Sequence, residues 1–206
     1  LPRLSYAEAM NRFGSDKPDT RYGMEIQDIS EYVKDCGFGV FTGAIEAGGS
    51  VRAIVAKQAA GTLTRKEIDK LTEMVKGIGA KGLAFIRWVE EKPSCSFGKF
   101  VGEDKLHEIL RALDCQQGDV VLIVADKNKV TLPVLGALRQ TVARKLDLIP
   151  EGQFNFLWIT QMPFFEWDED NNCWMAMHHP FTMPEDDCLQ YLDSAPEKVI
   201  AKAFDL

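Results

Sequence analysis

Two adjacent histidines, His178 and His179, carry the most specific side-chain chemistry in this sequence. They follow the run 173–177 and precede Pro180. A histidine ring can donate an N–H to a carboxylate, and its imidazolium form adds positive charge. Successive side chains of a strand point to opposite faces, so we expect only one of the two to face a ligand. The alternative is that both satisfy structural hydrogen bonds, and the same geometry argues against shared metal ligation.

A second set of charged side chains, Asp16, Lys17 and Asp19, lies in the stretch 14–19. Gly, Ser, Asp and Pro in this stretch favour turns over helix, so a loop is predicted here. The charges could face a substrate. A solvated turn accounts for them equally well, and the residues alone leave both interpretations open.

Four carboxylates gather near the end of the chain, at Glu166, Asp168, Glu169 and Asp170. Magnesium sites in proteins usually combine only one or two carboxylates with substrate phosphates. We therefore interpret this acidic tip as a solvated hairpin turn and predict no metal site.

A basic stretch contains Lys57, Arg65, Lys66, Lys70, Lys76 and Lys81. Such residues could form a modest face toward a nucleic-acid backbone. An ordinary solvated helix face is the favoured interpretation. The net charge of −7 over 206 residues also argues, weakly, against a nucleic-acid partner.

The composition is that of a globular protein, with 46% hydrophobic and 27% charged residues. No apolar run approaches the roughly 18 to 20 residues that a bilayer span needs, so no membrane segment is expected. From the start Leu1-Pro2-Arg3 we expect no signal peptide in this sequence, and we expect it to be a piece of a longer protein. Its five widely spaced cysteines favour a reducing, cytoplasmic setting in which they behave as small, mostly buried apolar residues.

Helices and strands are predicted from hydrophobic spacing and from capping boxes at Ser5/Glu8 and Thr64/Glu67. Thr131 is expected to cap the last helix, with Pro133 in its first turn. The predicted helices cover residues 6–13, 30–35, 64–77, 106–113 and 131–146. The predicted strands cover residues 37–41, 51–56, 83–89, 119–125, 154–160, 165–167 and 173–177. The first two strands are expected to form a hairpin, and the last two another.

These elements predict an α+β fold in which a central domain is flanked by two segments of different character. Both flanks resemble bacterial-type aspartyl-tRNA synthetases of class II. The run from Tyr6 to Asp19 resembles the stretch that follows the second class motif. The run from Phe156 to Thr182, which includes Met177-His178-His179-Pro180-Phe181, resembles the strand pair before the third class motif. In those enzymes an insertion called the GAD domain lies between the two, and an archaeal amidotransferase subunit shares it.

The resemblance implies three parts. Residues 1–28 are a catalytic-core segment after the second motif, 29–151 are the GAD insertion domain, and 152–206 are a core segment before the third motif. The fold expected is a β-sheet with flanking helices, attached to partial antiparallel-sheet segments of the synthetase core. At Gln161-Met162 the chain departs from the acidic-aromatic pair common in the family, so position 161 is assigned no role.

The resemblance also implies an activity for the parent protein. The parent would activate L-aspartate with ATP and Mg²⁺, transfer it to tRNA, and act in the cytoplasm as a homodimer. His178 is implied to contact the substrate aspartate, while His179 is expected to pack beside it. Asp16 and Lys17 lie in a loop whose role the resemblance leaves open, near either the substrate or the tRNA end.

The piece itself is expected to lack activity and bound cofactors, because the resemblance places the ATP-holding arginine before Leu1 and the third motif after Leu206. It could be monomeric, since the family dimerises through its first motif. The insert, whose only histidine is His107, is expected to be a binding or spacing module, with a place near the tRNA acceptor arm as one option. The competing interpretation is a non-catalytic, GAD-containing subunit of a tRNA-dependent amidotransferase.

Overall fold

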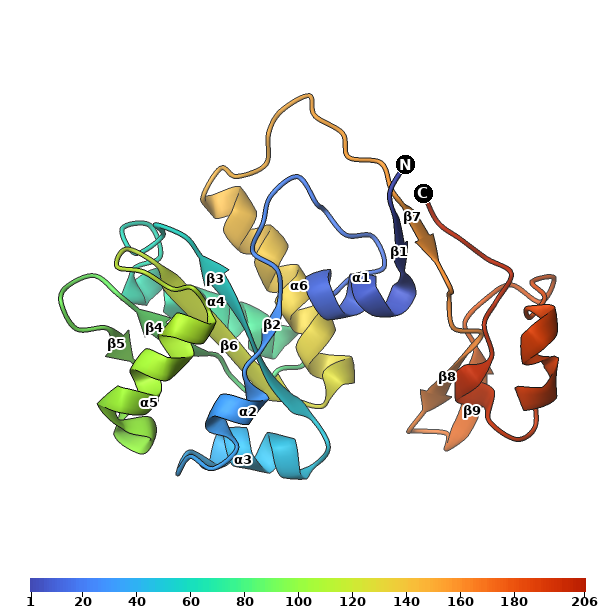
Figure 1. Ribbon diagram of the computed structural model, residues 1–206, viewed down its shortest axis with the longest axis horizontal. Helices are drawn as coiled ribbons and strands as arrows, with labels where there is room; N and C mark the ends of the chain where they lie inside the picture. The colour runs from blue at the N-terminus through green and yellow to red at the C-terminus, as the bar shows by residue number, and fades with distance from the viewer. The chain divides into compact units, whose positions relative to one another are not determined.

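The computed structural model describes residues 1–206 (Figure 1). The chain divides into two compact units. The smaller unit combines Leu1–Met10 with Phe154–Leu206, and the larger unit is Asn11–Gln153. None of the helices is both long and apolar enough to cross a bilayer.

A five-stranded antiparallel sheet forms the centre of the larger unit. Its strand order is β2-β3-β6-β4-β5, so the apolar strand predicted at 119–125 is the central one. Strands β3 and β6 pair over seven residues, from Ser50 opposite Asp126 to Ala56 opposite Val120. The strands are β2 (Gln27–Asp28), β3 (Ser50–Ala56), β4 (Ala84–Arg87), β5 (Ser94–Cys95) and β6 (Val120–Asp126).

Helices cover both faces of this sheet (Figure 1). On one face, odd-numbered residues of the two long strands pack with α2 (Ser30–Val33), α3 (Gly39–Glu46) and α5 (Gly98–Ala112). These strand residues are Val51, Ala53, Val55, Val121 and Ile123. The opposite face meets α6 (Asn128–Lys145), which contacts both central strands and also α4 (Arg65–Gly77). The predicted α+β class, a sheet with flanking helices, is confirmed.

The stretch 37–41, predicted as a strand, leads into helix α3, which begins at Gly39, so that prediction is wrong. Backbone N–H groups of Phe41 and Thr42 donate to the carbonyl of Phe38 at 2.9 and 3.2 Å and open the helix. The ring of Phe41 is buried and packs edge-on to Phe38 and Phe97, at 4.8 and 4.9 Å between centroids. Tertiary packing of these rings decides a short apolar run that spacing alone leaves ambiguous. The antiparallel neighbours of β3 are therefore β2 and β6.

Helix α6 begins earlier than predicted. Its first residue is Asn128 and its N-cap is Lys127, so Thr131 is not the cap and Pro133 lies inside the helix. The Thr131 side chain is buried and its hydroxyl donates to the carbonyl of Asp126 at 3.0 Å. This bond still ties the first turn of the helix to the end of β6.

The smaller unit has a short parallel pair and a hairpin. Strand β1 (Arg3–Ser5) pairs in parallel with β7 (Trp158–Thr160). The predicted hairpin is confirmed as β8 (Phe165–Asp168) and β9 (Cys173–Ala176). Two 3₁₀ turns, Asp186–Tyr191 and Pro196–Lys198, follow it. A small core holds these pieces and contains Ala9, Leu157, Ile159, Met162 and Ala201.

The first capping box is confirmed at the start of α1 (Tyr6–Phe13). The Glu8 carboxylate accepts from the Ser5 backbone at 2.9 Å, and the Ser5 hydroxyl accepts from the Glu8 backbone at 3.2 Å. The strand predicted from residue 154 is shorter than expected. Phe154 and Phe156 precede β7, stack on each other at 6.1 Å and remain exposed.

Candidate functional site

The two histidines lie in a bend just after β9, which ends at Ala176. His178 is half-buried, with its Nε2 2.9 Å from the carbonyl oxygen of Pro163. His179 is exposed, and its Nδ1 accepts from the backbone of Phe181 at 3.3 Å. The two rings therefore have different surroundings, although the strand alternation used to separate them does not extend to these positions.

The contact with Pro163 fixes how His178 could bind a carboxylate. A carbonyl oxygen can only accept, so Nε2 must carry the proton that it donates to Pro163. In the neutral ring Nδ1 is then an acceptor. It becomes a donor only when the ring is an imidazolium. The geometry therefore allows His178 to donate to a carboxylate from Nδ1 in its charged form.

Asp16 and Lys17 lie at the exposed tip of the loop that follows α1, within the larger unit. The Lys17 Nζ is 3.3 Å from the Asp16 carboxylate, and the two side chains are 74% and 42% exposed. Below them Asp19 binds Arg21 through two bonds, of 2.7 and 3.0 Å. Arg21 holds the pKa of the Asp19 carboxyl below its ordinary value. Asp19 thus has a structural partner inside the loop, whereas Asp16 and Lys17 face outward.

Arg139, on α6, is a buried cation that was not among the predicted site residues. It is 1% exposed and donates to the backbone carbonyls of Asp19, Gly23 and Met24. A signal was present, because position 139 lies on the apolar stripe of the predicted helix, four residues after Leu135 and three before position 142. A charged residue on a buried stripe needs polar partners, and here the loop 14–24 supplies them.

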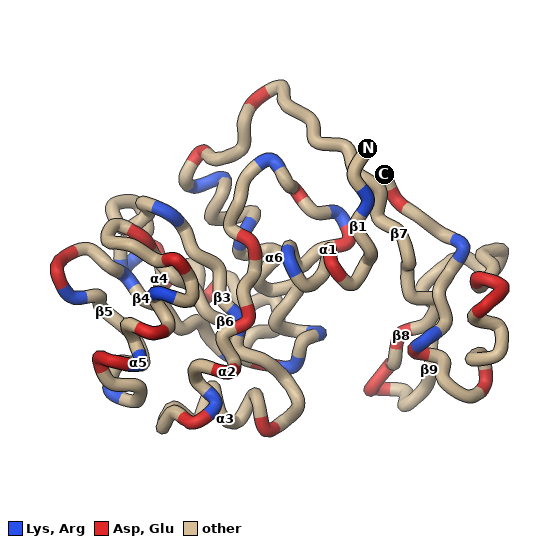
Figure 2. The backbone as a smooth tube through the Cα atoms, in the orientation of Figure 1, with Lys and Arg blue, Asp and Glu red and all other residues tan.

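The predicted basic stretch does not form an uncompensated positive face. Figure 2 shows Lys and Arg interspersed with Asp and Glu along this part of the chain. Of its six residues, five lie within 4.0 Å of a carboxylate oxygen. The pairs are Lys57 with Asp119, Arg65 with Asp69, Lys70 with Glu67, Lys76 with Glu73 and Lys81 with Asp126.

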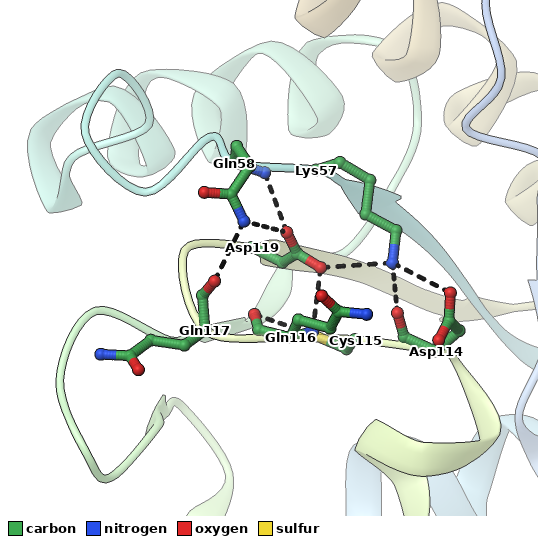
Figure 3. Close-up of polar contacts among 7 residues, drawn as sticks. All are labelled: Lys57, Gln58, Asp114, Cys115, Gln116, Gln117 and Asp119. Carbon is green, nitrogen blue, oxygen red and sulfur yellow. Dashed lines mark hydrogen bonds and ion pairs between the residues drawn. The ribbon is translucent and has the colours of Figure 1, made fainter.

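One of these lysines, Lys57, belongs to a polar corner at one end of the sheet (Figure 3). Asp119 is 1% exposed and accepts from the backbones of Gln58 and Gln116 at 2.8 and 2.9 Å. Lys57 Nζ approaches its carboxylate at 3.3 Å and also contacts Asp114. Burial acts to lower the pKa of Lys57, but the bond to Asp119 and the other nearby charges raise it overall. The corner joins the end of β3 to the turn before β6.

The acidic tip forms the predicted hairpin turn between β8 and β9. The Asp168 carboxylate accepts from the backbones of Asp170 and Asn171 at 2.9 and 3.1 Å, and from the Asn171 side chain at 2.7 Å. Asp168 is therefore used to close the turn.

The five cysteines are free thiols. Burial raises the pKa of Cys95 to about 11 and that of Cys115 to about 12, so neither is an activated nucleophile. Cys188 is buried and Cys36 is half-buried, as expected for small apolar residues. Cys173 is exposed, which contradicts that expectation at this position. It lies in β9, next to the hairpin turn.

Comparison with known proteins identifies the domain that forms most of the larger unit. Residues 41–135 match the family described as the GAD domain. The chain carries a GAD domain. The match begins in α3 and ends in α6, so it includes four of the five strands of the sheet, β3 to β6.

The regions on both sides of the GAD domain also have relatives. Over all 206 residues the chain is 51% identical to the aspartate–tRNA(Asp/Asn) ligase of Bacillus cytotoxicus. It is 50% identical to proteins of the same name from Bacillus cereus and Bacillus thuringiensis. The chain spans 35% of the length of these relatives. The resemblance to aspartyl-tRNA synthetases that the flanks suggested is thereby confirmed.

Proposed function

We propose that this chain is part of an aspartate–tRNA ligase, which activates L-aspartate with ATP and transfers it to tRNA. The identity of 51% over all 206 residues carries the proposal. A GAD domain alone would also fit the subunit of a tRNA-dependent amidotransferase. The match to ligases extends beyond 41–135 into both flanks, which favours the ligase.

His178 is the residue that we assign to the substrate aspartate. Its Nε2 is held by Pro163, so Nδ1 of the charged ring is available to donate to a carboxylate. His179 instead accepts a bond from its own turn and packs against the ring of Phe181 at 4.7 Å. It supports the local structure without facing aspartate.

The complete protein would supply the rest of the reaction. Aspartate activation joins a carboxylate to the α-phosphate of ATP, so cationic groups and Mg²⁺ must neutralise the phosphates. We assign these groups, the tRNA contacts and the homodimer interface to the full-length enzyme, acting in the cytoplasm. The 206 residues alone, which span 35% of the relatives' length, are expected to form no aspartyl-adenylate.

The GAD domain acts as a spacing or supporting module in this proposal. Five of the six basic side chains of its basic stretch are paired with carboxylates, which leaves little charge for a tRNA backbone. Titration of tRNA against the chain at low and moderate salt tests this directly. Tight binding that weakens steeply with salt would favour a place at the tRNA acceptor arm instead.

The test of the proposed function uses the full-length enzyme and aspartate-dependent exchange of pyrophosphate into ATP. His178→Ala is expected to raise the KM for aspartate by about 10- to 100-fold, the usual effect of losing a hydrogen bond to a charged group. His179→Ala is the matched control, with little change expected.

Two results would contradict the proposal. A full-length protein that exchanges pyrophosphate with another amino acid, and not with aspartate, would remove the ligase assignment. Equal effects of His178→Ala and His179→Ala on the KM for aspartate would remove the role of His178 and leave the ligase assignment intact. Separately, exchange by the isolated 206 residues well above a buffer blank would overturn their predicted inactivity.

A further inference from the structure

We propose that Arg139 is a positioning residue, through which the last helix of the GAD domain holds the loop 14–24 and so presents Asp16 and Lys17 to the substrates. The role of the loop toward substrates rests on the proposed function. The mechanical part of the proposal, that Arg139 orders the loop, stands on the contacts within the larger unit alone.

Arg139 forms three hydrogen bonds to the loop. Its Nε donates to Met24 at 2.9 Å, and one Nη donates to Gly23 at 2.9 Å and to Asp19 at 3.2 Å. All three acceptors are backbone carbonyls of one loop. The planar fork of a guanidinium suits several fixed acceptors at once, whereas an ammonium offers a single point of charge. Arg139 therefore fixes the backbone of the loop.

Two aromatic rings pack against the guanidinium of Arg139. The guanidinium carbon lies 4.9 Å from the centre of the Phe13 ring and 4.7 Å from that of Tyr22. Burying a cation is unfavourable unless hydrogen bonds and nearby electron density compensate. Phe13 ends α1 and Tyr22 lies in the loop, so the cation contacts residues on both sides of the tip. This arrangement closes the loop around one side chain of α6.

Two glycines allow the loop to approach α6 closely. A Cβ on Gly14 would lie 2.1 Å from the carbonyl oxygen of Leu132, and a Cβ on Gly136 would lie 2.3 Å from that of Gly14. Gly14 also has a φ of +68°, a backbone conformation that residues with a side chain rarely adopt. The loop backbone thus lies directly on the backbone of α6, about one helical turn before Arg139.

The loop then divides into a fixed base and an exposed tip. Asp19 and Arg21 are turned inward, with side chains 18% and 28% exposed, and Arg21 also donates to the carbonyl of Gln153 at 3.2 Å. Asp16 and Lys17 point outward. A reacting group held on a fixed base keeps its geometry, and small displacements of such groups cost rate or affinity. The support of this tip is a function for a domain in which we find no catalytic cluster.

The first experiment measures amide hydrogen exchange in the 206-residue chain. Arg139→Met is expected to speed exchange of the loop 14–24 about tenfold or more, while amides of β3 and β6 stay protected. Tyr22→Phe is the matched control, because the Tyr22 hydroxyl is buried without a hydrogen-bond partner and its ring is retained. Unchanged loop exchange in Arg139→Met would overturn the proposal. If Arg139→Met does not fold, Arg139→Lys is measured instead, with a smaller increase expected that is still confined to the loop, because an ammonium replaces only part of the guanidinium's bonding.

The second experiment measures kinetics in the full-length enzyme. Arg139→Met is expected to raise the KM for aspartate or ATP about tenfold, with a smaller change in kcat per active site, and Arg139→Lys should restore part of the loss. A merely structural role would lower the number of active sites and leave KM unchanged, which contradicts the proposal. If the wild-type enzyme does not activate aspartate, the proposed function fails, and the exchange experiment still decides whether Arg139 orders the loop.

Discussion

The larger unit contains two buried charges in different settings, and their comparison shows how position decides what a buried ion does. Asp119 and Arg139 are each 1% exposed. Asp119 accepts backbone N–H groups and Arg139 donates to backbone carbonyls. The chemistry is complementary, but Asp119 joins two central strands, whereas Arg139 joins a helix to a loop.

This difference separates global from local stabilisation. The donors to Asp119 are at Gln58, just after β3, and at Gln116, just before β6, and these strands pair over seven residues. Loss of Asp119 should therefore weaken the framework of the sheet. The acceptors of Arg139 all belong to the loop 14–24, which can leave α6 without unpairing a strand. Loss of Arg139 should mainly release the loop.

The largest expected effect is that of Asp119→Ala. It leaves two buried N–H groups without their acceptor, and we expect the free energy of unfolding to fall by about 3 to 5 kcal/mol, measured by urea unfolding of the chain. Asp114→Ala is the matched control, because that side chain is 85% exposed and its ion pair with Lys57 should contribute less than about 1 kcal/mol. Equal losses in the two variants would remove the distinction between a framework charge and a surface charge.

Gly136→Ala tests the contact between the loop and α6 from the helix side. The added methyl group would overlap the carbonyl of Gly14, so we expect a loss of about 1 to 3 kcal/mol and faster amide exchange in the loop. Gly43→Ala in α3 is the control, since nothing lies within 4 Å of its Cβ. There alanine should be neutral or stabilise the helix by up to about 1 kcal/mol. A Gly136→Ala protein with an undisturbed loop would show that the close approach is dispensable.

The sequence predicted the strands and helices of the molecule better than it predicted the contact of Arg139 with the loop 14–24. Strand β6 and helix α4 follow from continuous or periodic apolar residues, and α1 follows from a local capping box that the structure forms. The residues that make up each of these signals lie within a few positions of one another in the sequence. Arg139 meets Asp19 across 120 positions, and no local pattern reports a contact at that separation. Only its place on an apolar helical stripe indicated that it needed partners.

The same limit explains α3 and the histidines. The run that begins α3 has both aromatic and small residues, and its helical form depends on the ring of Phe97, far along the chain. His178 was found through its family context, but its bond to Pro163 fixes the orientation of the ring, and 15 residues separate the two. The role of His178 therefore stays a prediction from family context, whereas the tautomer could be assigned only from the fold.

The smallest expected effect is a pH dependence that separates the loop from the framework. Arg21 lowers the pKa of Asp19 below its ordinary value of 3.8, so the pair stabilises the folded protein above that pH. The contribution is lost as pH falls below 3.8 through the lowered pKa, because Asp19 then takes up a proton in the folded state too. We expect Asp19→Asn to lower the free energy of unfolding by about 0.2 to 1 kcal/mol at pH 7, measured by urea unfolding. The difference in this free energy between variant and wild type should shrink as the pH falls below the ordinary carboxyl pKa.

A double substitution tests whether the Asp19–Arg21 ion pair and Arg139 stabilise the same loop. In Arg139→Met, whose loop is already released, Asp19→Asn should cost less than it does in the wild type, since both residues act on one loop. The measurement is urea unfolding of the two single variants and the double variant at pH 7. If Asp19→Asn costs as much in the Arg139→Met background as in the wild type, Asp19 and Arg139 stabilise the protein independently. The loop would then have two separate supports, whereas the comparison of Arg139 with Asp119 assumes that the loop has one.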